Sequence, residues 1–493
     1  MRERYGASPG VLTVACVAGA GLLAALPPPA FAQQVVVQGD AARMAIEPYT
    51  AATALGSRAE LAASLGAFNT SLTAAVERGG GGLTLSDSAW SAVQNPAAWT
   101  SDDVQLKAGW TIDSNTQINL EAGSNERRTR NFPAALGVDT DAQLATDETS
   151  FLRLRGGVEA GRLTSQFGAE TSTTALTTQT VGGTDPASRQ WLTTRKLFAN
   201  LDWRLTEQVS LEAGQSAQNL VVGWRSGGDV SSQASYLTPS LALAVTPWEG
   251  AKWRVEAEQT LTPINPAQFA AYAQLATPGT GSAPQPDRGW RYGVRLEHEL
   301  PGGVGVTAQV NDWRYASVTD LGPVGPSEAP VSIGPGSRQQ LDLGVKAPLS
   351  PSMLGGATLA GELTWRRSQV ADPFTGQQRA FSGESPYRAQ LSLSGAAPLS
   401  ALTWSVVASA DGPQNLYQMT QVTNLGATAG LGGSLSYGLG SVQVSLQLDN
   451  VIGGSRQVTT FNYSGSRADS ALSGIDRRGD DSRAVRFSLK RGL

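Results

Sequence analysis

Apolar and polar residues alternate over long stretches of this 493-residue chain. The clearest example is the pair of segments 425–437 and 442–449, which a glycine-rich turn at 438–440 connects. In the second segment every even-numbered residue is Val or Leu, and every odd-numbered residue is polar. Because side chains alternate between the two faces of a strand, each segment has one apolar and one polar face. The pattern predicts an antiparallel β-hairpin.

The same pattern recurs from about residue 100 onward and predicts eight hairpins and a lone last strand at 485–490. Short turns are predicted at 113–115, 160–161, 206–208, 247–250, 301–303, 351–356, 397–400 and 438–440. The connections between hairpins are long and rich in Gly, Pro, Ser and Asp, as at 125–149, 262–288, 314–338 and 452–483. Short turns at one end and long loops at the other are typical of the periplasmic and extracellular ends of an outer-membrane barrel.

The predicted fold class is therefore all-β, a transmembrane antiparallel β-barrel with a short, partly helical N-terminal segment. The hairpins and last strand give about 17 strands, and bacterial barrels usually have an even number. A further strand is therefore predicted near Leu83 to Trp90. The estimate is about 18 strands, with 16 to 22 left open.

A barrel in lipid should carry aromatic residues on its outer face, near the strand ends. The apolar phase of the predicted strands contains Trp110, Trp203, Trp253, Trp290, Tyr292, Trp365, Tyr387, Trp404 and Tyr437. The alternative is a soluble β-sandwich with a Trp-rich core. That fold would need only about half as many strands and would not sort its loops by length, so we favour the barrel.

The opposite phase of the strands is polar and often charged. A cation facing lipid at mid-depth would cost ~2–4 kcal/mol, so these residues should face water or one another. Their simplest role is a ladder of mixed charge that fills the lumen, and their functional role would be to steer or bind a solute. The candidates for ligand binding are Lys107, Arg153, Arg155, Glu159, Arg204, Glu212, Arg254, Glu256, Arg295, Glu297, Glu362 and Arg366.

The N-terminus has the parts of a cleavable signal peptide. Basic residues at 2 and 4, an apolar run at 11–26 and the small-x-small site Ala30-Phe31-Ala32 predict export, with cleavage after Ala32. We therefore divide the chain into a signal peptide (1–32), an N-terminal segment (33–99) and an outer-membrane barrel (100–493). The Ala-rich stretch 41–75 predicts weak helix. The N-terminal segment could be a short insert, a tether or a plug remnant, and it includes the strand predicted at 83–90.

The composition argues against several functions. The chain has one histidine, His298, and its one cysteine, Cys16, lies in the predicted signal peptide. A His/Cys metal site therefore lacks ligands, and a Ser-His-Asp enzyme would depend on a single imidazole. We predict no enzyme, no catalytic residue, no metal and no cofactor. The net charge of −4, without a basic stripe, argues against nucleic acid. The expected partners are outer-membrane lipid, the barrel assembly machinery and a small-molecule solute.

Several phrases of the C-terminal part resemble the barrel of TonB-dependent outer-membrane receptors. They are residues 329–333, 341–343, 370–379, 448–450 and 477–478. The resemblance implies import of a scarce nutrient, such as siderophore-iron, cobalamin or an oligosaccharide, with the TonB energy-coupling complex as a further partner. In that family a folded plug precedes the barrel, and here it is expected to be reduced or missing. The segment 34–39 is similar to the entry of a plug or a coupling box, which makes Val35, Val36 and Val37 the energy-coupling candidates.

Three functions follow as hypotheses. The first is a receptor-like importer with a reduced plug. The second is a passive, porin-like channel, because 16–18 strands enclose a water-filled pore when nothing plugs it. The third is a structural or adhesive barrel that binds through its long extracellular loops. The sequence does not identify the solute.

Overall fold

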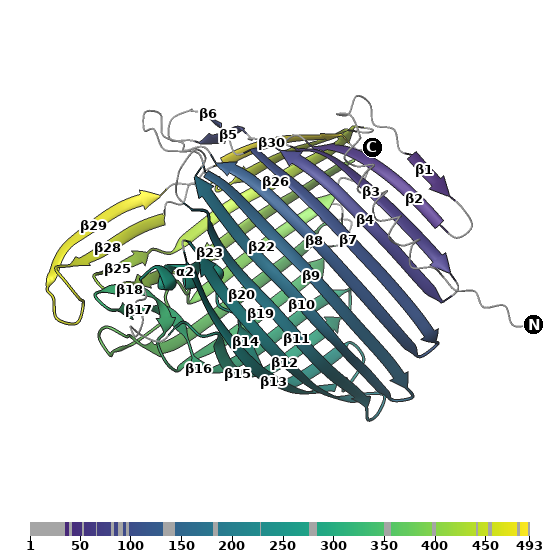
Figure 1. The fold of residues 1–493 in the computed structure, drawn as a ribbon, viewed down its shortest axis with the longest axis horizontal. Helices are drawn as coiled ribbons and strands as arrows, with labels where there is room; N and C mark the ends of the chain where they lie inside the picture. The colour runs from purple at the N-terminus through teal and green to yellow at the C-terminus, as the bar shows by residue number, and fades with distance from the viewer. Residues whose placement is uncertain are drawn as a thin grey trace, which may run out of the picture.

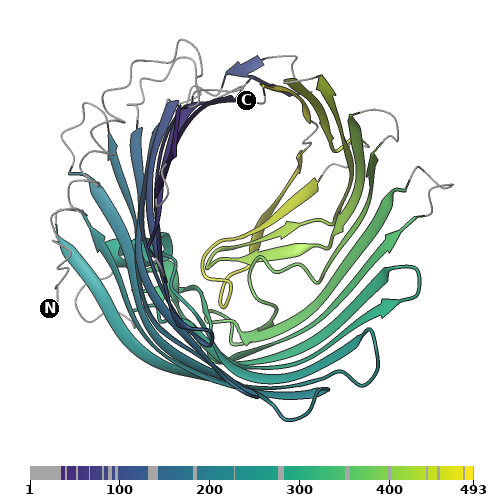
Figure 2. The ribbon, with the colours of Figure 1, turned by 90° about the vertical axis from the view of Figure 1, so that its right-hand side faces the viewer.

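The computed structural model shows one large, twisted antiparallel sheet that curls into a barrel (Figures 1 and 2). It describes residues 35–38, 42–51, 54–65, 67–79, 83–86, 92–94, 98–131, 143–180, 186–226, 228–275, 283–349, 356–396, 401–439, 442–451, 456–480 and 484–491. The predicted signal peptide and its cleavage site after Ala32 lie outside these residues.

Within the described residues, the main sheet has 24 strands. Its longer strands are β2 (Ala42–Ala51), β3 (Ala54–Leu65), β4 (Phe68–Gly79), β7 (Ala98–Asp113), β8 (Thr116–Asn131), β9 (Gln143–Ala160), β10 (Leu163–Thr180), β11 (Ser188–Arg204), β12 (Val209–Arg225), β13 (Asp229–Val245), β14 (Ala251–Thr262), β15 (Asp287–Leu300), β16 (Val304–Ser317), β19 (Gly336–Pro348), β20 (Thr358–Ala371), β22 (Tyr387–Ala396), β23 (Leu402–Asp411), β26 (Thr428–Leu439), β27 (Val442–Asp449) and β30 (Ala484–Arg491). Four more strands have two to four residues each, namely β1 (Val35–Gln38), β5 (Leu83–Ser86), β6 (Ala92–Gln94) and β21 (Gln378–Arg379). The 20 longer strands of the described residues lie within the predicted range, and the all-β fold class is confirmed.

The long loops carry secondary structure of their own at one end of the barrel. We call these elements together the cap. They are α2 (Pro266–Leu275), the hairpin β17 (Thr319–Val324) and β18 (Ser327–Ser332), the segment 372–386 with β21, and a four-stranded sheet of β24 (Gln414–Tyr417), β25 (Gln421–Leu425), β28 (Arg456–Tyr463) and β29 (Leu472–Asp480). Figure 2 looks along the barrel and shows β28 and β29, in yellow, reaching across the ring.

Among the described residues, no helix is long and apolar enough to cross a membrane.

The short turns predicted at 113–115, 160–161, 206–208, 247–250, 301–303 and 438–440 fall between consecutive strands to within two residues, at the end opposite the cap. Most of the turn predicted at 351–356 and all of the turn predicted at 397–400 lie outside the described residues. The turn between β15 and β16 shows why the sequence marks these positions so clearly. Gly302 and Gly303 have φ angles of +88° and +77° there. Only glycine adopts this left-handed region without steric cost, so a Gly-Gly pair at the end of an alternating segment is a strong turn signal.

The weak helix predicted over 41–75 is wrong, because β2, β3 and β4 lie there and pair in succession. β4 in turn pairs with β7, with Phe68 opposite Trp110 and Leu72 opposite Leu106. An alternation signal was present, since Phe68, Leu72 and Val76 share one face of β4 with Thr70 and Ala74. Pairing within the sheet overrides the helix propensity of alanine. The wall therefore begins before residue 100, and the strand predicted at 83–90 is the short β5.

The ring has a seam between β2 and β30. Their Cα atoms come within 8 Å of each other, but among the described residues no strand pairing joins them. Short strands cover both edges instead, since β1 pairs with β2 and β5 pairs with β30. Within the described residues, strand pairing therefore does not close the ring completely. An unpaired strand edge is costly, and here short N-terminal strands shield it in part.

The outward phase of the wall is apolar and exposed, as the sequence predicts for a face in contact with lipid. Leu197 on β11 has 62% of its surface exposed, although a leucine is ordinarily buried. Eight of the nine predicted lipid-facing aromatic residues are likewise exposed, and Trp404 is half-buried. A soluble sandwich would bury these side chains. Their exposure on a curved sheet supports a transmembrane barrel with lipid outside.

Candidate functional site

The luminal face of the wall carries a chain of ion pairs that we call the luminal ladder. It begins on β7 to β10. Glu121 lies 3.9 Å from Lys107 Nζ and accepts a hydrogen bond from Arg153 at 3.3 Å. Arg155 donates to Glu170 at 2.6 Å on the adjacent strand. Each of these residues lies in the phase opposite the exposed leucines, so their side chains point into the ring.

The ladder continues through β9, β11, β12 and β14. Arg204 donates to Glu159 at 3.3 Å. Arg254 bridges two carboxylates, because it pairs with Glu212 and also with Glu256 at 3.0 Å. Two of these pairs reach over an intervening strand, β10 or β13, and the Arg254–Glu256 pair lies along β14.

The ladder is most buried around Arg291 on β15. Arg291 donates to Glu256 at 2.7 Å and to Glu258 at 3.0 Å, and its side chain is 19% exposed. Gly293 makes room for this arrangement, since a side chain there would meet Glu256 Oε1 and Asn311 Oδ1 at 2.9 Å. Arg291 was not among the predicted candidates, although its position two residues before Gly293 in the polar phase was a usable signal.

The remaining predicted candidates lie at the far side of the ladder. Arg295 and Glu297 pair with each other at 2.6 Å. Arg366 on β20 donates to Gln340 Oε1 at 2.9 Å. Glu362 faces the lumen, and within the described chain it has no ion-pair partner. The structure thus places all twelve predicted residues on the luminal face. Whether any of them binds a solute stays a prediction.

A luminal pocket of about 410 Å³ lies within the ladder, over β10 to β14. Asp202, Glu212, Arg254, Glu256 and Glu258 contribute charge to its lining. Even with Arg291, which pairs with Glu256 and Glu258, the four carboxylates outnumber the guanidinium groups, so this part of the wall carries an excess of negative charge. A neutral or cationic part of a solute would be favoured there over an anion.

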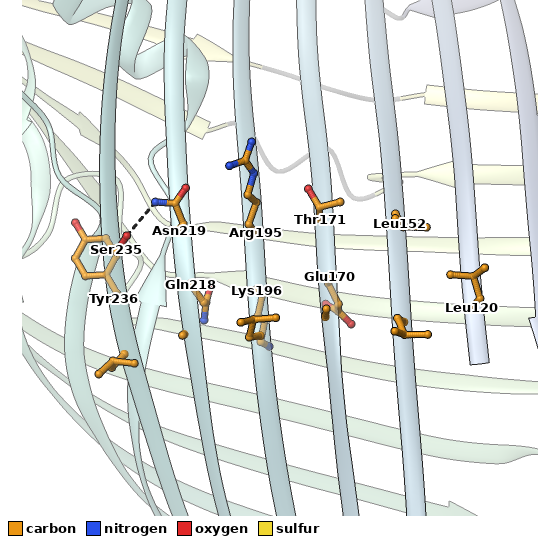
Figure 3. Close-up of a pocket in the computed structure, with 15 residues that line it drawn as sticks. Leu120, Leu152, Glu170, Thr171, Arg195, Lys196, Gln218, Asn219, Ser235 and Tyr236 are labelled. Atoms are coloured by element: carbon orange, nitrogen blue, oxygen red, sulfur yellow. Dashed lines mark hydrogen bonds between the residues drawn. The ribbon is translucent and has the colours of Figure 1, made fainter. Parts of the chain in front are cut away.

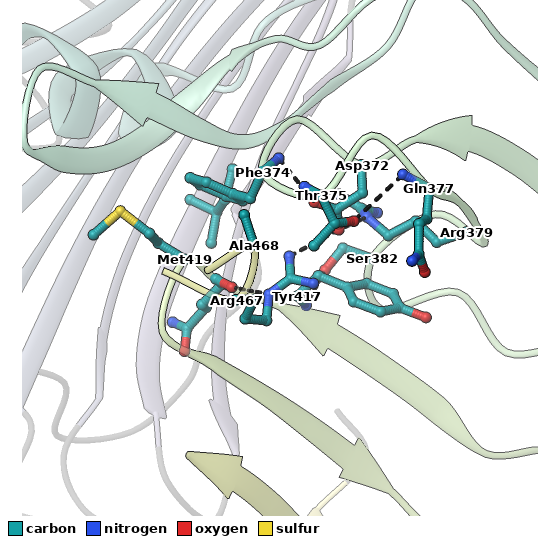
Figure 4. Close-up of polar contacts among 12 residues, drawn as sticks. Asp372, Phe374, Thr375, Gln377, Arg379, Ser382, Tyr417, Met419, Arg467 and Ala468 are labelled. Carbon is teal, nitrogen blue, oxygen red and sulfur yellow. Dashed lines mark hydrogen bonds and ion pairs between the residues drawn. The ribbon is translucent and has the colours of Figure 1, made fainter. Parts of the chain in front are cut away.

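The cap is held together by a buried group of charged residues that we call the cap network (Figure 4). Asp372 accepts hydrogen bonds from Arg379 at 2.9 Å and from Arg467 at 2.7 Å. Arg379 also donates to Asp320 at 3.0 Å and stacks over the ring of Tyr417 at 4.4 Å. These residues come from four different loops, so the network ties the cap into one unit.

Asp372 is the centre of the cap network. Its other oxygen accepts hydrogen bonds from the backbone N–H groups of Phe374 and Thr375 at 2.9 and 3.1 Å. Burial alone would raise the pKa of Asp372, but the hydrogen bonds from Arg467 and the two N–H groups outweigh burial and hold the pKa below its ordinary value. The carboxylate therefore stays ionised at neutral pH.

The cap also packs against the luminal wall through apolar side chains. Phe269 and Ala273 of α2 form a cluster with Val222 of β12, and Leu192 and Trp224 pack against it. An adjacent side of α2 contacts β18 through Tyr272, which packs near Val324, Ala329 and Val331. Val222 and Trp224 lie in the inward phase of β12, so α2 sits inside the mouth of the barrel.

The cap network was not predicted from the sequence. The family resemblance of residues 370–379 assigns no role to Asp372 or Arg379. Asp372 followed by Pro373 and Gly376 does signal a turn in which the carboxylate bonds to the backbone. Nothing in the sequence indicates that Arg467, 95 residues further on, reaches the same carboxylate.

The structure also places the energy-coupling candidates and the single histidine. Val35, Val36 and Val37 form β1, opposite residues 44–46 of β2. Their role in energy coupling stays a prediction. His298 lies at the short-turn end, with Nδ1 3.2 Å from the carbonyl oxygen of Gly250. In the described part of the chain, no group of three or more His, Cys, Asp or Glu side chains is arranged to hold a metal ion.

The geometry defines the class of the protein as a transmembrane β-barrel whose mouth is narrowed by a structured cap. No family model matches the sequence, and no curated protein matches it.

Solved structures share the fold. The ferric-catecholate import receptor Fiu from E. coli K12 has a TM-score of 0.65 and 11% identity, over 93% of this chain and 79% of that one. The siderophore receptor PiuA from Acinetobacter baumannii has a TM-score of 0.63 and 10% identity, over 91% and 77%. The ferric yersiniabactin uptake receptor FyuA from Yersinia pestis has a TM-score of 0.62 and 14% identity, over 94% and 77%.

At these identities the likeness establishes the fold. It confirms, at that level, the resemblance to the barrel of TonB-dependent receptors that the C-terminal phrases indicated. The three solved structures are receptors and transporters rather than enzymes.

Proposed function

We propose that the protein is an outer-membrane transport protein that binds a scarce nutrient at its cap and luminal ladder and admits it to the periplasm. The observation that carries the proposal is the combination of this barrel fold with a structured cap over a charged lumen. A cap of this kind narrows access from outside, which suits a receptor for a particular solute better than a general pore. The solved structures with this fold include a siderophore receptor, a ferric-catecholate import receptor and a ferric yersiniabactin uptake receptor.

The candidate solutes are siderophore-iron, cobalamin and oligosaccharides. Of these, the excess of carboxylates in the luminal pocket favours a solute that presents cationic or hydroxyl groups to β10–β14 over one that is purely anionic. The TonB energy-coupling complex would drive import, with Val35, Val36 and Val37 on the segment that it contacts.

A growth and uptake experiment tests this proposal. A strain that lacks its own receptors is given the full chain, and uptake of ferric siderophores, cobalamin and maltodextrins is measured with and without a protonophore. The proposal predicts that uptake of one class stops when the inner membrane is de-energised and when residues 35–39 are deleted. Uptake that survives both treatments would contradict active coupling.

The second candidate is a passive channel, and one observation favours it. The described residues ahead of β7 that form long strands, β2 to β4, pair into the wall. In the described chain they therefore enlarge the ring rather than fill it. A barrel of this size with an open lumen conducts ions.

Planar-bilayer recording separates the two candidates. A passive channel would give a steady conductance that needs no energised membrane, and deletion of residues 35–39 would leave it unchanged. A closed receptor would give no steady conductance until the cap is opened. The cap variants described in the Discussion provide that opening.

A further inference from the structure

A hollow lies on the outer face of the barrel over β8 to β13, and we call it the outer trough (Figure 3). Its volume is about 870 Å³. Outward leucines line much of it, namely Leu152, Leu154, Leu197 and Leu237. These side chains are 46% to 62% exposed. An apolar groove of this kind on a lipid-facing surface is shaped to take an acyl chain along the wall.

A row of polar side chains borders the trough toward the cap. The strand register places Thr171, Arg195, Asn219 and Ser235 directly opposite one another on β10, β11, β12 and β13. Arg195 shares the outward phase of β11 with Leu197, so its side chain points away from the lumen. Figure 3 shows it beside Asn219 in the trough. The edge of the trough nearer the cap therefore carries a cation, an amide and hydroxyl groups. Hydrocarbon side chains line the rest.

Arg195 is one of several wall arginines, with Arg366 and Arg367, that have no counter-ion within the described residues. No ion pair or hydrogen bond to Arg195 is present within the described residues. Its neighbour Asn219 donates from Nδ2 to Ser235 Oγ at 2.9 Å, whereas Asn219 Oδ1 is buried without a hydrogen-bond partner. A donor and a buried acceptor thus stand side by side without partners at the top of an apolar groove. Buried polar groups normally have partners, so an occupant is expected here.

The depth of Arg195 agrees with the headgroup level of the outer leaflet. From Trp203, near the short-turn end of β11, to Arg195 the chain rises eight residues, which is roughly 20 Å at the usual strand rise and tilt. The apolar band of such barrels is about 25 Å tall. Trp191, four residues further along the same face, occupies the position of a boundary aromatic residue. A cation costs only about 0–1 kcal/mol at this level, against ~2–4 kcal/mol at mid-depth.

We propose that the outer trough is a binding site for a phosphorylated acyl lipid of the outer leaflet. Arg195 donates to the phosphate, and Asn219 Oδ1 accepts a hydrogen bond from a hydroxyl or amide group of the headgroup. An acyl chain lies along Leu197, Leu237 and Leu154. Arginine suits this role because it stays protonated and its planar group donates two parallel hydrogen bonds to a phosphate. The site faces lipid rather than the lumen, so it stands apart from the proposed transport function.

Native mass spectrometry of the full protein, released from dodecyl maltoside micelles, tests the site. The two probes are dioleoyl phosphatidic acid and dioleoylglycerol, which differ only in the phosphate. The wild-type protein should retain phosphatidic acid in preference to diacylglycerol. Arg195→Gln should lower the retention of phosphatidic acid about tenfold, because a charge-assisted hydrogen bond is lost, and should leave diacylglycerol unchanged.

Arg367→Gln is the matched control. Arg367 is also exposed, outward-facing and near the cap end, but it lies on β20 outside the trough. Retention in this variant should equal that of the wild type. Equal losses in the two variants would contradict the proposal, because any interfacial cation would then serve. No preference for phosphatidic acid in the wild type would also overturn it.

Two further arms separate a lipid site from a simple anion site. Leu197→Asn should lower the retention of both probes, since it removes part of the apolar trough. Inorganic phosphate at equal concentration should fail to displace phosphatidic acid. Full displacement by inorganic phosphate, or unchanged retention in Leu197→Asn, would show that no acyl chain occupies the trough.

Discussion

The luminal ladder and the cap network are both built from arginine and carboxylate pairs, yet their surroundings differ sharply. In the ladder, Arg204 and Glu159 keep 58% and 55% of their side chains exposed. In the cap network, Arg379 and Asp372 keep 6% and 2%. Exposed pairs contribute about 0–1 kcal/mol each, whereas removing one partner of a buried pair costs about 3–5 kcal/mol. Apart from the more buried group around Arg291, the wall therefore relies on many weak, replaceable pairs, and the cap depends on a few that cannot be replaced singly.

Loss of the central carboxylate should have the largest effect. Asp372→Ala leaves Arg379 and Arg467 buried without their shared partner, so the cap should be destabilised by about 3–5 kcal/mol. Hydrogen exchange of residues 414–425 and 456–480 should accelerate, while exchange in β7 to β16 stays slow. Asp411→Ala, which breaks the exposed pair with Arg388, is the control and should change neither region. If hydrogen exchange in the cap were as slow in Asp372→Ala as in the wild type, the account would be contradicted.

The second effect tests the two faces of one wall strand. Ala199→Arg places a cation toward lipid near mid-depth and should cost ~2–4 kcal/mol, whereas Asn200→Arg places it in the lumen at little cost. The free energies of unfolding, measured by urea titration in lipid vesicles, give the comparison. Equal costs at the two neighbouring positions would mean that the outward phase does not face lipid.

Acid should open the cap without unfolding the wall. Because the folded-state pKa of Asp372 is depressed, its contribution is fully present above the unfolded value of about 4 and is lost as the pH falls through the folded value. Protease cleavage within the cap should therefore stay constant from pH 7 to about 5 and rise only below about 4. Asp372→Asn should lack this acid step. A rise in protease cleavage near neutral pH would contradict the role of Asp372.

The smallest effect is expected for a single pair of the luminal ladder. Arg204→Gln breaks the pair with Glu159 and should change the free energy of unfolding by less than about 1 kcal/mol. Its effect should be on permeation instead, because it leaves one more uncompensated carboxylate in the lumen. If the lumen conducts, the reversal potential measured in a salt gradient should show a higher permeability for cations relative to anions than in the wild type. If the free energy of unfolding fell by several kcal/mol, the ion pairs of the ladder would depend on one another as strongly as those of the cap network.

The barrel wall could be predicted from the sequence because each of its strands and turns is marked by a pattern of neighbouring residues. Alternation over 442–449 and the Gly-Gly pair at 302–303 each specify a strand or a turn without reference to distant residues. The cap could not be predicted, because its stability comes from contacts such as Asp372 with Arg467 that no local pattern encodes. The N-terminal strands fall between these cases. Alternation at Phe68 and Leu72 was present, but the alanines around it favoured helix, and only pairing with β7 decided the outcome.

The most direct test of the account is the period-two alternation of lipid and water contact along β11. The chain's single cysteine, Cys16, lies in the predicted signal peptide, so single cysteines can be introduced from residue 196 to 201 and spin-labelled in lipid vesicles. The account predicts that labels at Leu197, Ala199 and Leu201 are relaxed by oxygen dissolved in lipid, and labels at Lys196, Phe198 and Asn200 by an aqueous nickel chelate. Equal access of the aqueous reagent to both sets would contradict a barrel with lipid outside and water inside.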